Sequence, residues 1–571
     1  MKKLLSSVIV TSLMMASLAG CGGSSSPTTD ASSTADTSSA SATSDSAESS
    51  SSEATETATD DTVEKRTDLI FANFRDIRDP NPHLYQGEMW FQEMVYETLV
   101  SVEPSGIEPC LAESWEISED GLTYTFQIRE GVTFTNGEGF DAYVVEANFN
   151  ALWDNIDRHV WMESARVVSG FEATDATTFV ITLSEPYSPF MTELGVTRPY
   201  GMAAPATMIQ NSGSVFGEEI DMMGTTRDGV TEYIGTGTYY MGEYVESEYV
   251  YMERNEDYWG ELPAIERVVV KVIPDSQTRV MALESGEIDL IYGGNLIDAT
   301  TLSAYTDSDK FTVGYSEPTL TKHLLMNSSD EILADQAVRE ALIHAIDKEA
   351  INEGIFYGME IVADNLYAPN VPYCDVDLEP FDFNEEKSIE LLEDAGWVAG
   401  SDGIRTKDGQ RLSLKYLYDI DTVTDKQIGE FLQYEFGLIG VELTLDGYER
   451  ETYFDMGKVG EFDIMMNIPW GNPYDPHAAL SAMRGPVYGD YAAQLGLEIK
   501  EQLDADITEV LKIVDEDERQ AMYAKILTEL HEAAIYIPLV YETNKALHNS
   551  ELQDVGFMTS SYVIPFWNMH Y

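Results

Sequence analysis

Cysteines and basic residues are scarce in this chain of 571 residues, and both shortages exclude classes of protein. The three cysteines, at positions 21, 110 and 374, are too few and too widely spaced for a disulfide framework or a zinc cage. The 33 lysines and arginines stand against 101 aspartates and glutamates, a formal net charge of −68. Nucleic-acid phosphates and anionic lipid both attract basic surfaces, so neither is a natural partner of the folded part.

Motifs of the common enzyme classes are also missing. The sequence has no Gly-x-Ser-x-Gly elbow, no phosphate-binding loop ending in Lys-Ser or Lys-Thr, and no Cys-x-x-Cys pair. Its eight histidines contain no i, i+4 pair that could hold a metal from one helix. A solvated surface explains nearly all of the carboxylates, so no acid–base pair stands out. We therefore expect a binding protein with no permanent cofactor, and not an enzyme.

Residues 1–21 have the pattern of a secretory leader. Lys2 and Lys3 form a basic start, and an uncharged run follows as far as Ala19. This run is too short for a comfortable membrane span, and no later segment reaches about 18 consecutive apolar residues. The leader ends in Leu18-Ala-Gly-Cys21, which resembles a bacterial lipobox, in which the cysteine is acylated and becomes the first mature residue. We predict lipid attachment at Cys21; an ordinary signal peptide with a chance cysteine is the alternative.

Residues 22–66 cannot build a core and are predicted to be a disordered tether. Of the 39 residues from 24 to 62, 30 are serine, threonine or alanine, eight are acidic and one is proline. Residues 67–571 keep 92 acidic and 29 basic residues, a net charge of −63, so the folded part is itself strongly acidic. An acylated cysteine followed by a disordered tether predicts a globular protein that is anchored to the outer, extracytoplasmic face of the cell membrane.

Strand-like and helix-like segments alternate from residue 67 onward, which is typical of an α/β fold with mixed sheets. Residues 268–273 predict a strand so apolar that both of its faces should be covered. Residues 338–346 have helical spacing, in a helix that Asp335 can cap and Gly354 can end. Asn384 can cap a further helix, which Gly396 stops.

Several segments resemble the large-solute, family 5 substrate-binding proteins of ABC importers, which take peptides, nickel and related cargo. They are Leu111-Ala-Glu-Ser-Trp115 continuing to Phe134, Arg254-Asn-Glu-Asp-Tyr-Trp-Gly260, Ile273-Pro-Asp-Ser-Gln-Thr-Arg279 and Val338-Arg-Glu-Ala-Leu342. The resemblance covers essentially all of residues 67–571. It implies a type II periplasmic-binding-protein-like fold, in which two α/β lobes close on a ligand around a hinge of two crossing segments. The crossings would lie near residues 315–327 and 535–543, with 67–314 plus 544–571 as lobe one and 315–543 as lobe two.

Four motifs make the nickel-binding branch of this family the nearer match. They are Asn81-Pro-His-Leu-Tyr85, Arg158-His-Val-Trp161, Arg198-Pro199 and Trp470-Gly-Asn-Pro-Tyr474-Asp-Pro-His477. Peptide binders of the family tend to carry an aspartate shortly after the equivalent of Trp470, where it holds the amino terminus of the peptide. Here Gly471, Asn472 and Pro473 follow Trp470, so these positions offer no carboxylate that could bind the amino terminus of a peptide. The resemblance therefore favours nickel-type cargo over di- or oligopeptides.

The resemblance to the nickel branch also implies ligand-binding residues. The positions that match Arg158 and Arg198 hold carboxylates of a metal chelate, which suits a guanidinium because it binds carboxylates with two parallel hydrogen bonds. In so acidic a chain, a surface partner is the alternative for either arginine. The remaining matches are aromatic or apolar residues that line the cavity: Trp161, Trp470, Tyr474, Met89 and Tyr453, the last with an alignment that can slip onto Phe454.

One position departs from the nickel branch. That branch can use a histidine as its one direct protein ligand to the metal, and the matching position here is Tyr488. A neutral phenol is a poor nickel ligand at neutral pH, and no histidine lies within ten residues of Tyr488. His83 and His477 are weak metal candidates beside prolines, where structural hydrogen bonding is the more natural role. Cys110 is most simply a buried apolar residue.

The resulting hypothesis is a lipid-anchored, monomeric protein that captures a chelated metal, of the nickel, metallophore or amino-acid-complex type, for an ABC permease and its ATPase. A di- or oligopeptide importer is the first alternative. A surface sensor or receptor without a transporter is the second.

Overall fold

The computed structural model describes residues 66–571, except 79, 85, 86, 104, 155, 160, 161, 208–232, 294, 295, 469–475 and the side chain of Arg158. The described residues belong to one compact unit. The predicted leader, Cys21 and the tether as far as residue 65 lie outside them. Within this described part, every helix falls short of the length and apolarity of a membrane span.

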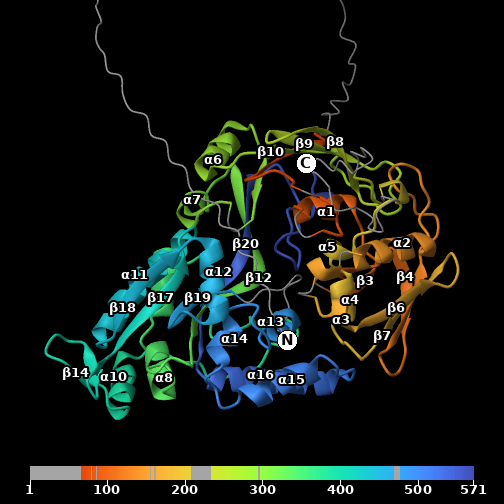
Figure 1. Cartoon of the computed structure of the whole chain (residues 1–571). Coiled ribbons are helices and arrows are strands. Elements are labelled where there is room, and N and C mark those ends of the chain that lie inside the picture. Colours follow the sequence, from red (N-terminus) through yellow and green to blue (C-terminus); the bar gives the residue numbers. More distant parts are fainter. Residues whose placement is uncertain are drawn as a thin grey trace, which may run out of the picture. The chain divides into compact units, whose positions relative to one another are not determined.

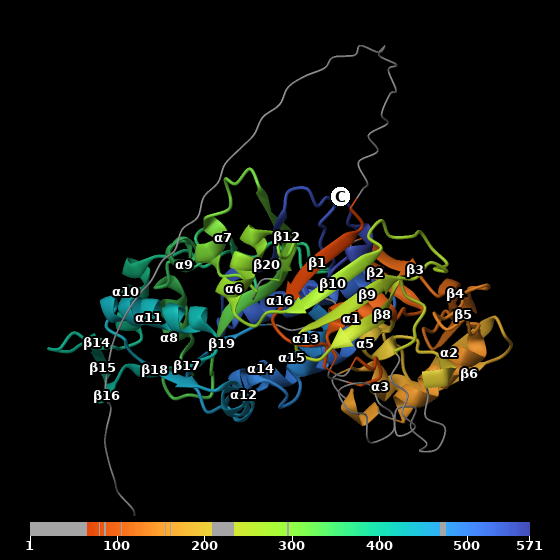
Figure 2. The same cartoon turned by 90° about the horizontal axis from the view of Figure 1, so that it is seen from above.

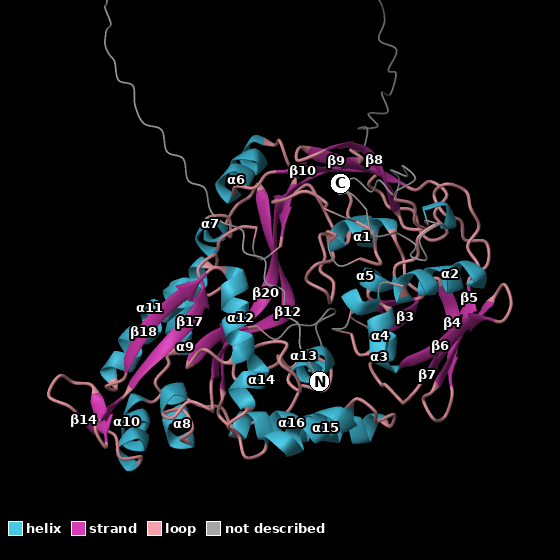
Figure 3. Ribbon diagram, viewed as in Figure 1, coloured by secondary structure: helices cyan, strands magenta, loops and turns pink. Residues whose placement is uncertain are grey.

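Eleven strands of the described residues form one mixed sheet: β1 (Asp68–Asn73), β8 (Tyr239–Val245), β9 (Tyr249–Arg254), β10 (Arg267–Val272), β11 (Leu290–Tyr292), β12 (Phe311–Met326), β13 (Ile361–Val362), β17 (Ser413–Asp419), β18 (Glu442–Tyr448), β19 (Ile464–Asn467) and β20 (Tyr536–Asn549). The order is β18–β17–β19–β12–β20–β11–β1–β10–β9–β8, and β13 pairs with β20 outside this path. Figures 1 and 3 show β17, β18 and β19 on one side of β12 and β20, and β8, β9 and β10 on the other. β1 pairs in parallel with β10, whereas β10 pairs antiparallel with β9. The predicted mixed α/β class is therefore confirmed.

The middle of this sheet is formed by its two longest strands, β12 and β20. They run antiparallel beside each other along most of their lengths, and the register shifts on either side of Pro318. Proline has no backbone N–H to donate, and a bulge bends the strand that carries it. The predicted crossing segments, residues 315–327 and 535–543, lie mostly on these two strands.

β10 corrects one expectation about burial. The apolar run at residues 268–273 does form a strand, which lies between β1 and β9 (Figure 2). Val268 and Val270 are buried, but Val269 and Lys271 are partly exposed, so only one face of the strand is fully covered. Lys271 uses the more open face to pair with Glu287 at 3.0 Å. The prediction that both faces are covered was wrong, because a strand with an antiparallel neighbour can present one face to water.

The remaining strands form three smaller sheets among the described residues. A four-stranded antiparallel sheet has the order β4 (Ala112–Ile117), β5 (Thr123–Ile128), β7 (Thr178–Leu183), β6 (Val168–Ala173). A pair is formed by β2 (Val100–Glu103) and β3 (Gly106–Pro109), and a three-stranded sheet by β14 (Val398–Ala399), β15 (Arg405–Lys407) and β16 (Gln410–Arg411).

The described part contains sixteen α-helices: α1 (Met89–Val95), α2 (Ala142–Trp153), α3 (Ser164–Val167), α4 (Phe190–Leu194), α5 (Thr197–Tyr200), α6 (Ser276–Ser285), α7 (Ala299–Ser303), α8 (Gln336–His344), α9 (Lys348–Ile355), α10 (Glu385–Asp394), α11 (Val423–Leu438), α12 (Arg450–Val459), α13 (Pro476–Ala482), α14 (Gly489–Gln494), α15 (Lys500–Val510) and α16 (Glu516–Glu532). Its 3-10 turns are η1 (Ile156–Arg158), η2 (Pro205–Thr207) and η3 (Phe566–Asn568).

Helix caps explain where two predicted helices begin and where one of them breaks. The Asp335 side chain accepts a hydrogen bond from the Ala337 amide, so the cap is confirmed. The predicted helix is two helices, however, because α8 ends at His344 and Asp347 caps α9 through the Ala350 amide. A second strong N-cap residue inside an apolar periodic pattern is the sequence signal for this break. Asn384 caps α10 as predicted, through the Lys387 amide.

Three clusters of buried apolar side chains form the core. One, which includes Phe71, packs around β1 and β8–β11, and another, which includes Leu342, packs around β17–β19 and helices α8–α11. The third joins residues that are far apart in the chain, such as Phe149 of α2 and Ile526 of α16. This third cluster therefore connects the 99–234 region to residues beyond 470.

Candidate functional site

Four of the residues predicted to line the ligand site have described side chains: Met89, Arg198, Tyr453 and Tyr488. The others lie outside the described side chains: Arg158, Trp161, Trp470 and Tyr474. Residues on either side of these positions show which segments meet there.

Arg198 lies half-buried in α5, close to the start of α1. Its φ of −104° and ψ of 101° depart from helical geometry, as expected of a residue that precedes proline, and the Arg198–Pro199 peptide bond is cis. One guanidinium nitrogen, Nη1, donates a hydrogen bond to the Gly87 carbonyl at 3.1 Å. Gly87 lies two residues before the buried Met89, so the structure brings the segments of Met89 and Arg198 together.

His83 connects the Arg198 segment to the Arg158 segment. Its Nε2 lies 3.2 Å from the Gly201 carbonyl, and its own carbonyl accepts a hydrogen bond from His159 Nε2 at 2.8 Å. Burial lowers the pKa of His83 to about 3, so the ring is neutral at physiological pH. His83 is therefore a buried hydrogen-bonding residue of the scaffold. Because His159 directly follows Arg158, both predicted arginines belong to segments that meet at His83.

Tyr453 and Tyr488 belong to another part of the fold, where α12 and α14 contact each other. Tyr453 is buried in α12, and its hydroxyl donates a hydrogen bond to the Met466 carbonyl at the end of β19. Burial raises the pKa of Tyr453 well above its ordinary value, so it stays a neutral donor. Tyr488 is half-buried at the N-cap of α14, and its ring packs edge-on against Phe454 at 6.4 Å between centroids. Tyr453 and Phe454 thus both lie close to the Tyr488 position.

A partly buried polar network lies beside Tyr488 and was not predicted from the sequence. Asn467 Nδ2 donates to Asp490 Oδ2 at 2.9 Å, and the Tyr536 hydroxyl donates to Asp490 Oδ1 at 3.1 Å. His323 Nε2 lies 3.3 Å from the same Asn467 amide nitrogen. Burial raises the pKa of Asp490 and lowers that of His323 to about 3. The network joins β12, β19, β20 and α14, and the only sequence signal for it was an aspartate two residues after Tyr488.

His477 contacts a buried carboxylate, Glu193 of α4, with 3.6 Å between His477 Nε2 and Glu193 Oε1. Glu193 also accepts hydrogen bonds from the Ser164 amide at 3.0 Å and the Tyr187 hydroxyl at 2.6 Å. Burial alone would raise the pKa of Glu193, but the contact with His477 and these hydrogen bonds outweigh it and lower the pKa. His477 therefore contacts a buried carboxylate that belongs to a distant segment of the chain.

In the part of the chain that the structure describes, Cys110 and the histidines do not come together with carboxylates in a metal-binding group. Within the described ranges, no set of three or more histidine, cysteine, aspartate or glutamate side chains is placed to hold a metal ion. Cys110 is partly exposed, which corrects its expected full burial, and its Sγ lies 3.8 Å from Glu97 Oε1. Burial raises the pKa of this thiol well above its ordinary value, which disfavours the thiolate that a metal needs.

A cavity of about 550 Å³ lies between the β2–β3 pair and α4 on one side and β12, α13 and α16 on the other. Glu103, Thr192, Pro318, His477 and Tyr523 are among its lining residues. Of the residues predicted for the ligand site or as metal candidates, His477 lines it, whereas Met89, Arg198, Tyr453 and Tyr488 do not. The volume falls within the range of small-molecule sites, at roughly 300–1,000 Å³.

Comparison with known proteins gives consistent matches over most of the chain. The model of bacterial extracellular solute-binding proteins, family 5 (middle), matches residues 106–490. The nickel-binding periplasmic protein of Escherichia coli (strain K12) is 38% identical over 491 residues, which cover 85% of this chain and 91% of that protein.

Solved structures give the same result. The crystal structure of NikA from Brucella suis in complex with Fe(III)-EDTA is 39% identical, with a TM-score of 0.83, and the match covers 88% of this chain and 99% of that one. NikZ from Campylobacter jejuni, in complex with Ni(L-His), is 23% identical with a TM-score of 0.69 and the same coverage, which supports the fold alone. The fold is thus that of the two-lobed periplasmic binding proteins. The chain belongs to family 5 of the bacterial extracellular solute-binding proteins, the substrate-binding components of ABC importers, which act outside the cytoplasm and are not enzymes.

Proposed function

We propose that this protein captures a metal ion, of the nickel type, that is already wrapped in a small carboxylate-bearing chelator, and delivers it to an ABC permease. The observation that carries the proposal is the placement of Arg198. Its guanidinium is half-buried and held by the Gly87 carbonyl, on a segment that meets the Arg158 segment at His83. Two guanidinium groups in one site suit carboxylates and repel bare cations.

The proposed ligand site combines these arginines with neutral side chains. Aromatic rings supply apolar area with a polar tip, which suits the organic part of a chelate. The proposed contact residues are Arg158, Arg198, Trp161, Trp470, Tyr474, Met89, Tyr453 and Tyr488. The similarity to a nickel-binding protein from Escherichia coli and to a Brucella suis protein in complex with Fe(III)-EDTA supports a chelated metal as the cargo.

The proposed architecture assigns residues 67–314 and 544–571 to lobe one and residues 315–543 to lobe two. β12 and β20 then carry the chain between the lobes, and the register shifts around Pro318 mark a place where the strands can bend. Ligand would bind between the lobes and favour the closed arrangement, which is the form that a permease recognises.

Isothermal titration of the folded chain, from residue 66 onward, tests this function. We expect nickel(II) with excess L-histidine to bind one-to-one with an affinity that added salt hardly changes. Nickel(II) chloride alone should bind weakly and in a salt-dependent way, because exposed carboxylates attract cations through screened electrostatics. Tight, salt-resistant binding of free nickel would contradict the proposal. Tight binding of a metal-free dipeptide would replace it with peptide import.

Attachment to the membrane is a separate proposal, which rests on Leu18-Ala-Gly-Cys21 and the acidic tether. The mature protein would begin at an acylated Cys21. We expect the Cys21→Ser variant to move from the membrane fraction to the soluble or secreted fraction, because the serine hydroxyl does not replace the acylated thiol. Immunoblots of fractionated cells measure this shift. A serine variant that stays with the membranes at the wild-type level would show that no lipid is attached at this position.

A further inference from the structure

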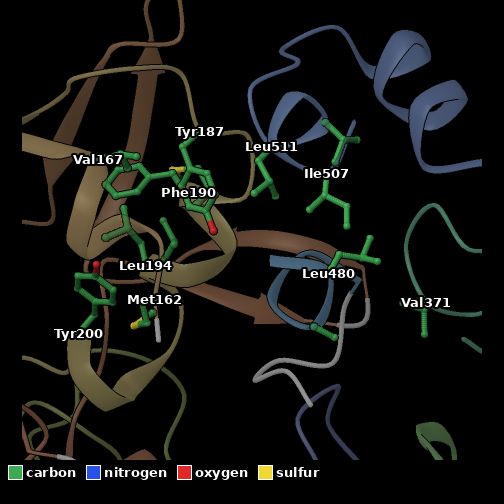
Figure 4. Close-up of a cluster of buried hydrophobic side chains, with 14 of the residues drawn as sticks. Met162, Val167, Tyr187, Phe190, Leu194, Tyr200, Val371, Leu480, Ile507 and Leu511 are labelled. Carbon is green, nitrogen blue, oxygen red and sulfur yellow. The ribbon is translucent and has the colours of Figure 1, made fainter. Parts of the chain in front are cut away.

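Two segments that belong to different proposed lobes pack against each other in one buried apolar cluster. Residues 162–194 carry α3 and α4, and residues 476–512 carry α13 and α15. Figure 4 shows part of the buried cluster that they share. Its apolar members include Tyr187, Phe190 and Leu194 from the first segment and Leu480, Ile507 and Leu511 from the second.

Two ion pairs and one contact between a histidine and a carboxylate border this apolar contact. Arg484 Nη2 lies 3.2 Å from Glu163 Oε2, and Lys512 Nζ lies 2.6 Å from Glu185 Oε2. The third pair is His477 and Glu193, at 3.6 Å. In each pair the acid comes from residues 162–194 and the base from residues 476–512. This arrangement is informative in a chain whose acidic residues outnumber its basic residues about threefold.

The Glu163–Arg484 pair is held in place by its neighbours. Arg484 Nη1 donates to Thr508 Oγ1 at 3.0 Å, and Nη2 donates to Ser481 Oγ at 2.7 Å. Ser481 Oγ in turn donates to Glu163 Oε2 at 3.0 Å. The Glu163 and Arg484 side chains are only 16% and 19% exposed. A pair that is fixed and partly desolvated contributes more than a mobile surface pair.

Backbone contact completes the interface. The Ser188 amide and hydroxyl both donate to the Leu511 carbonyl, at 2.8 and 3.2 Å. Separating the two segments would break these hydrogen bonds, the two ion pairs and the contact between His477 and Glu193, and would expose apolar side chains to water.

We propose that the pairs Glu163–Arg484, Glu185–Lys512 and Glu193–His477 form an interlobe latch, which stabilises the closed state and slows the release of the ligand. The inference rests on the proposed lobes and on the proposed chelate-binding function. Glu163 follows the Arg158–Trp161 motif by two residues, and His477 follows Tyr474 by three. Ligand contacts made by those motifs therefore favour the same arrangement of the chain that closes the latch.

The test compares three variants of residues 21–571 that carry serine at position 21 and hence no lipid. Arg484→Met removes the charge of the most fixed pair while keeping an unbranched, apolar side chain. Lys512→Glu places a second carboxylate against Glu185, and Glu185→Lys combined with Lys512→Glu restores attraction with the charges exchanged. Arg411→Met is the matched control, because Arg411 pairs with Glu442 at 2.8 Å inside lobe two.

Small-angle X-ray scattering without ligand and stopped-flow release of nickel(II)–histidine are the two readouts. We expect Arg484→Met and Lys512→Glu to increase the radius of gyration and to accelerate release about tenfold, equivalent to roughly 1.4 kcal/mol. The variant that combines Glu185→Lys with Lys512→Glu should restore the radius of gyration and the release rate of the unaltered protein. Arg411→Met should change neither quantity. Thermal unfolding of each variant separates loss of the latch from loss of the fold.

The two readouts keep the latch distinguishable from the proposed function. If Arg484→Met has the same radius of gyration and the same release rate as Arg411→Met, the latch proposal is wrong. If the unaltered protein fails to bind nickel(II)–histidine, the proposed function fails. The radius of gyration then decides alone: an increase in Arg484→Met and Lys512→Glu supports the latch, and no increase overturns it.

Discussion

Replacing Arg198 with alanine is expected to raise the dissociation constant for nickel(II)–histidine more than about a hundredfold. The loss of a guanidinium that pairs with a buried carboxylate leaves that carboxylate without its partner, which costs roughly 2–5 kcal/mol. Isothermal titration measures the loss. Arg198→Lys should recover only part of the affinity, because an ammonium group carries the charge but not the planar fork.

The controls for this prediction address stability and net charge. Arg198 also donates to the Gly87 carbonyl, so each variant needs a thermal unfolding curve. Arg267→Ala removes the same charge from β10, where Arg267 is 40% exposed and pairs with Glu253 at 2.8 Å. We expect this control to bind the chelate normally. If Arg198→Ala binds as tightly as Arg267→Ala, Arg198 has only a structural role, through its hydrogen bond to the Gly87 carbonyl.

Replacing Tyr488 with histidine is expected to strengthen binding of free nickel(II) by about tenfold or more. Imidazole is a good nickel ligand at neutral pH, whereas a neutral phenol is a poor one. Tyr488 is half-buried at the start of α14 with its ring against Phe454, so a smaller ring fits the same place. Titration with nickel(II) chloride, with and without L-histidine, measures both affinities.

Tyr488→Phe is the matched control for this gain. It keeps the ring that packs on Phe454 and removes only the hydroxyl, so free nickel should remain a weak ligand. A gain of affinity in Tyr488→His alone would place this position at the metal. Equal affinities for free nickel in the histidine and phenylalanine variants would show that position 488 does not reach the metal.

Local sequence patterns predicted most of the local structure considered above, and the two failures have different causes. The caps at Asp335 and Asn384 were predicted because a side chain and an amide two or three residues away make the contact. The break between α8 and α9 was missed because apolar spacing continues through it. The exposure of one face of β10 was missed because it depends on which strands and helices lie beside it.

The candidate site shows the same division. Arg198 and Tyr488 were proposed as site residues because the motifs at or before these positions resemble those of family 5. The roles of His83 and Glu193 needed the fold: His83 bonds to Gly201 and His159, and Glu193 contacts His477. Among so many carboxylates, composition offered no reason to select Glu193.

The sequence by itself determined the α/β class, the family and the strong acidity of this protein, because each depends on residue types or on short contiguous motifs. Only the tertiary structure decided which of the many carboxylates form ion pairs with the few lysines and arginines. Glu163 and Arg484 are 321 residues apart, and Glu185 and Lys512 are 327 apart. These ion pairs form only because β12 and β20 connect the two halves of the fold and because an apolar cluster packs α4 near α13 and α15. Charge attraction is too weak and too short-ranged in salt water to select such partners before this packing brings them together.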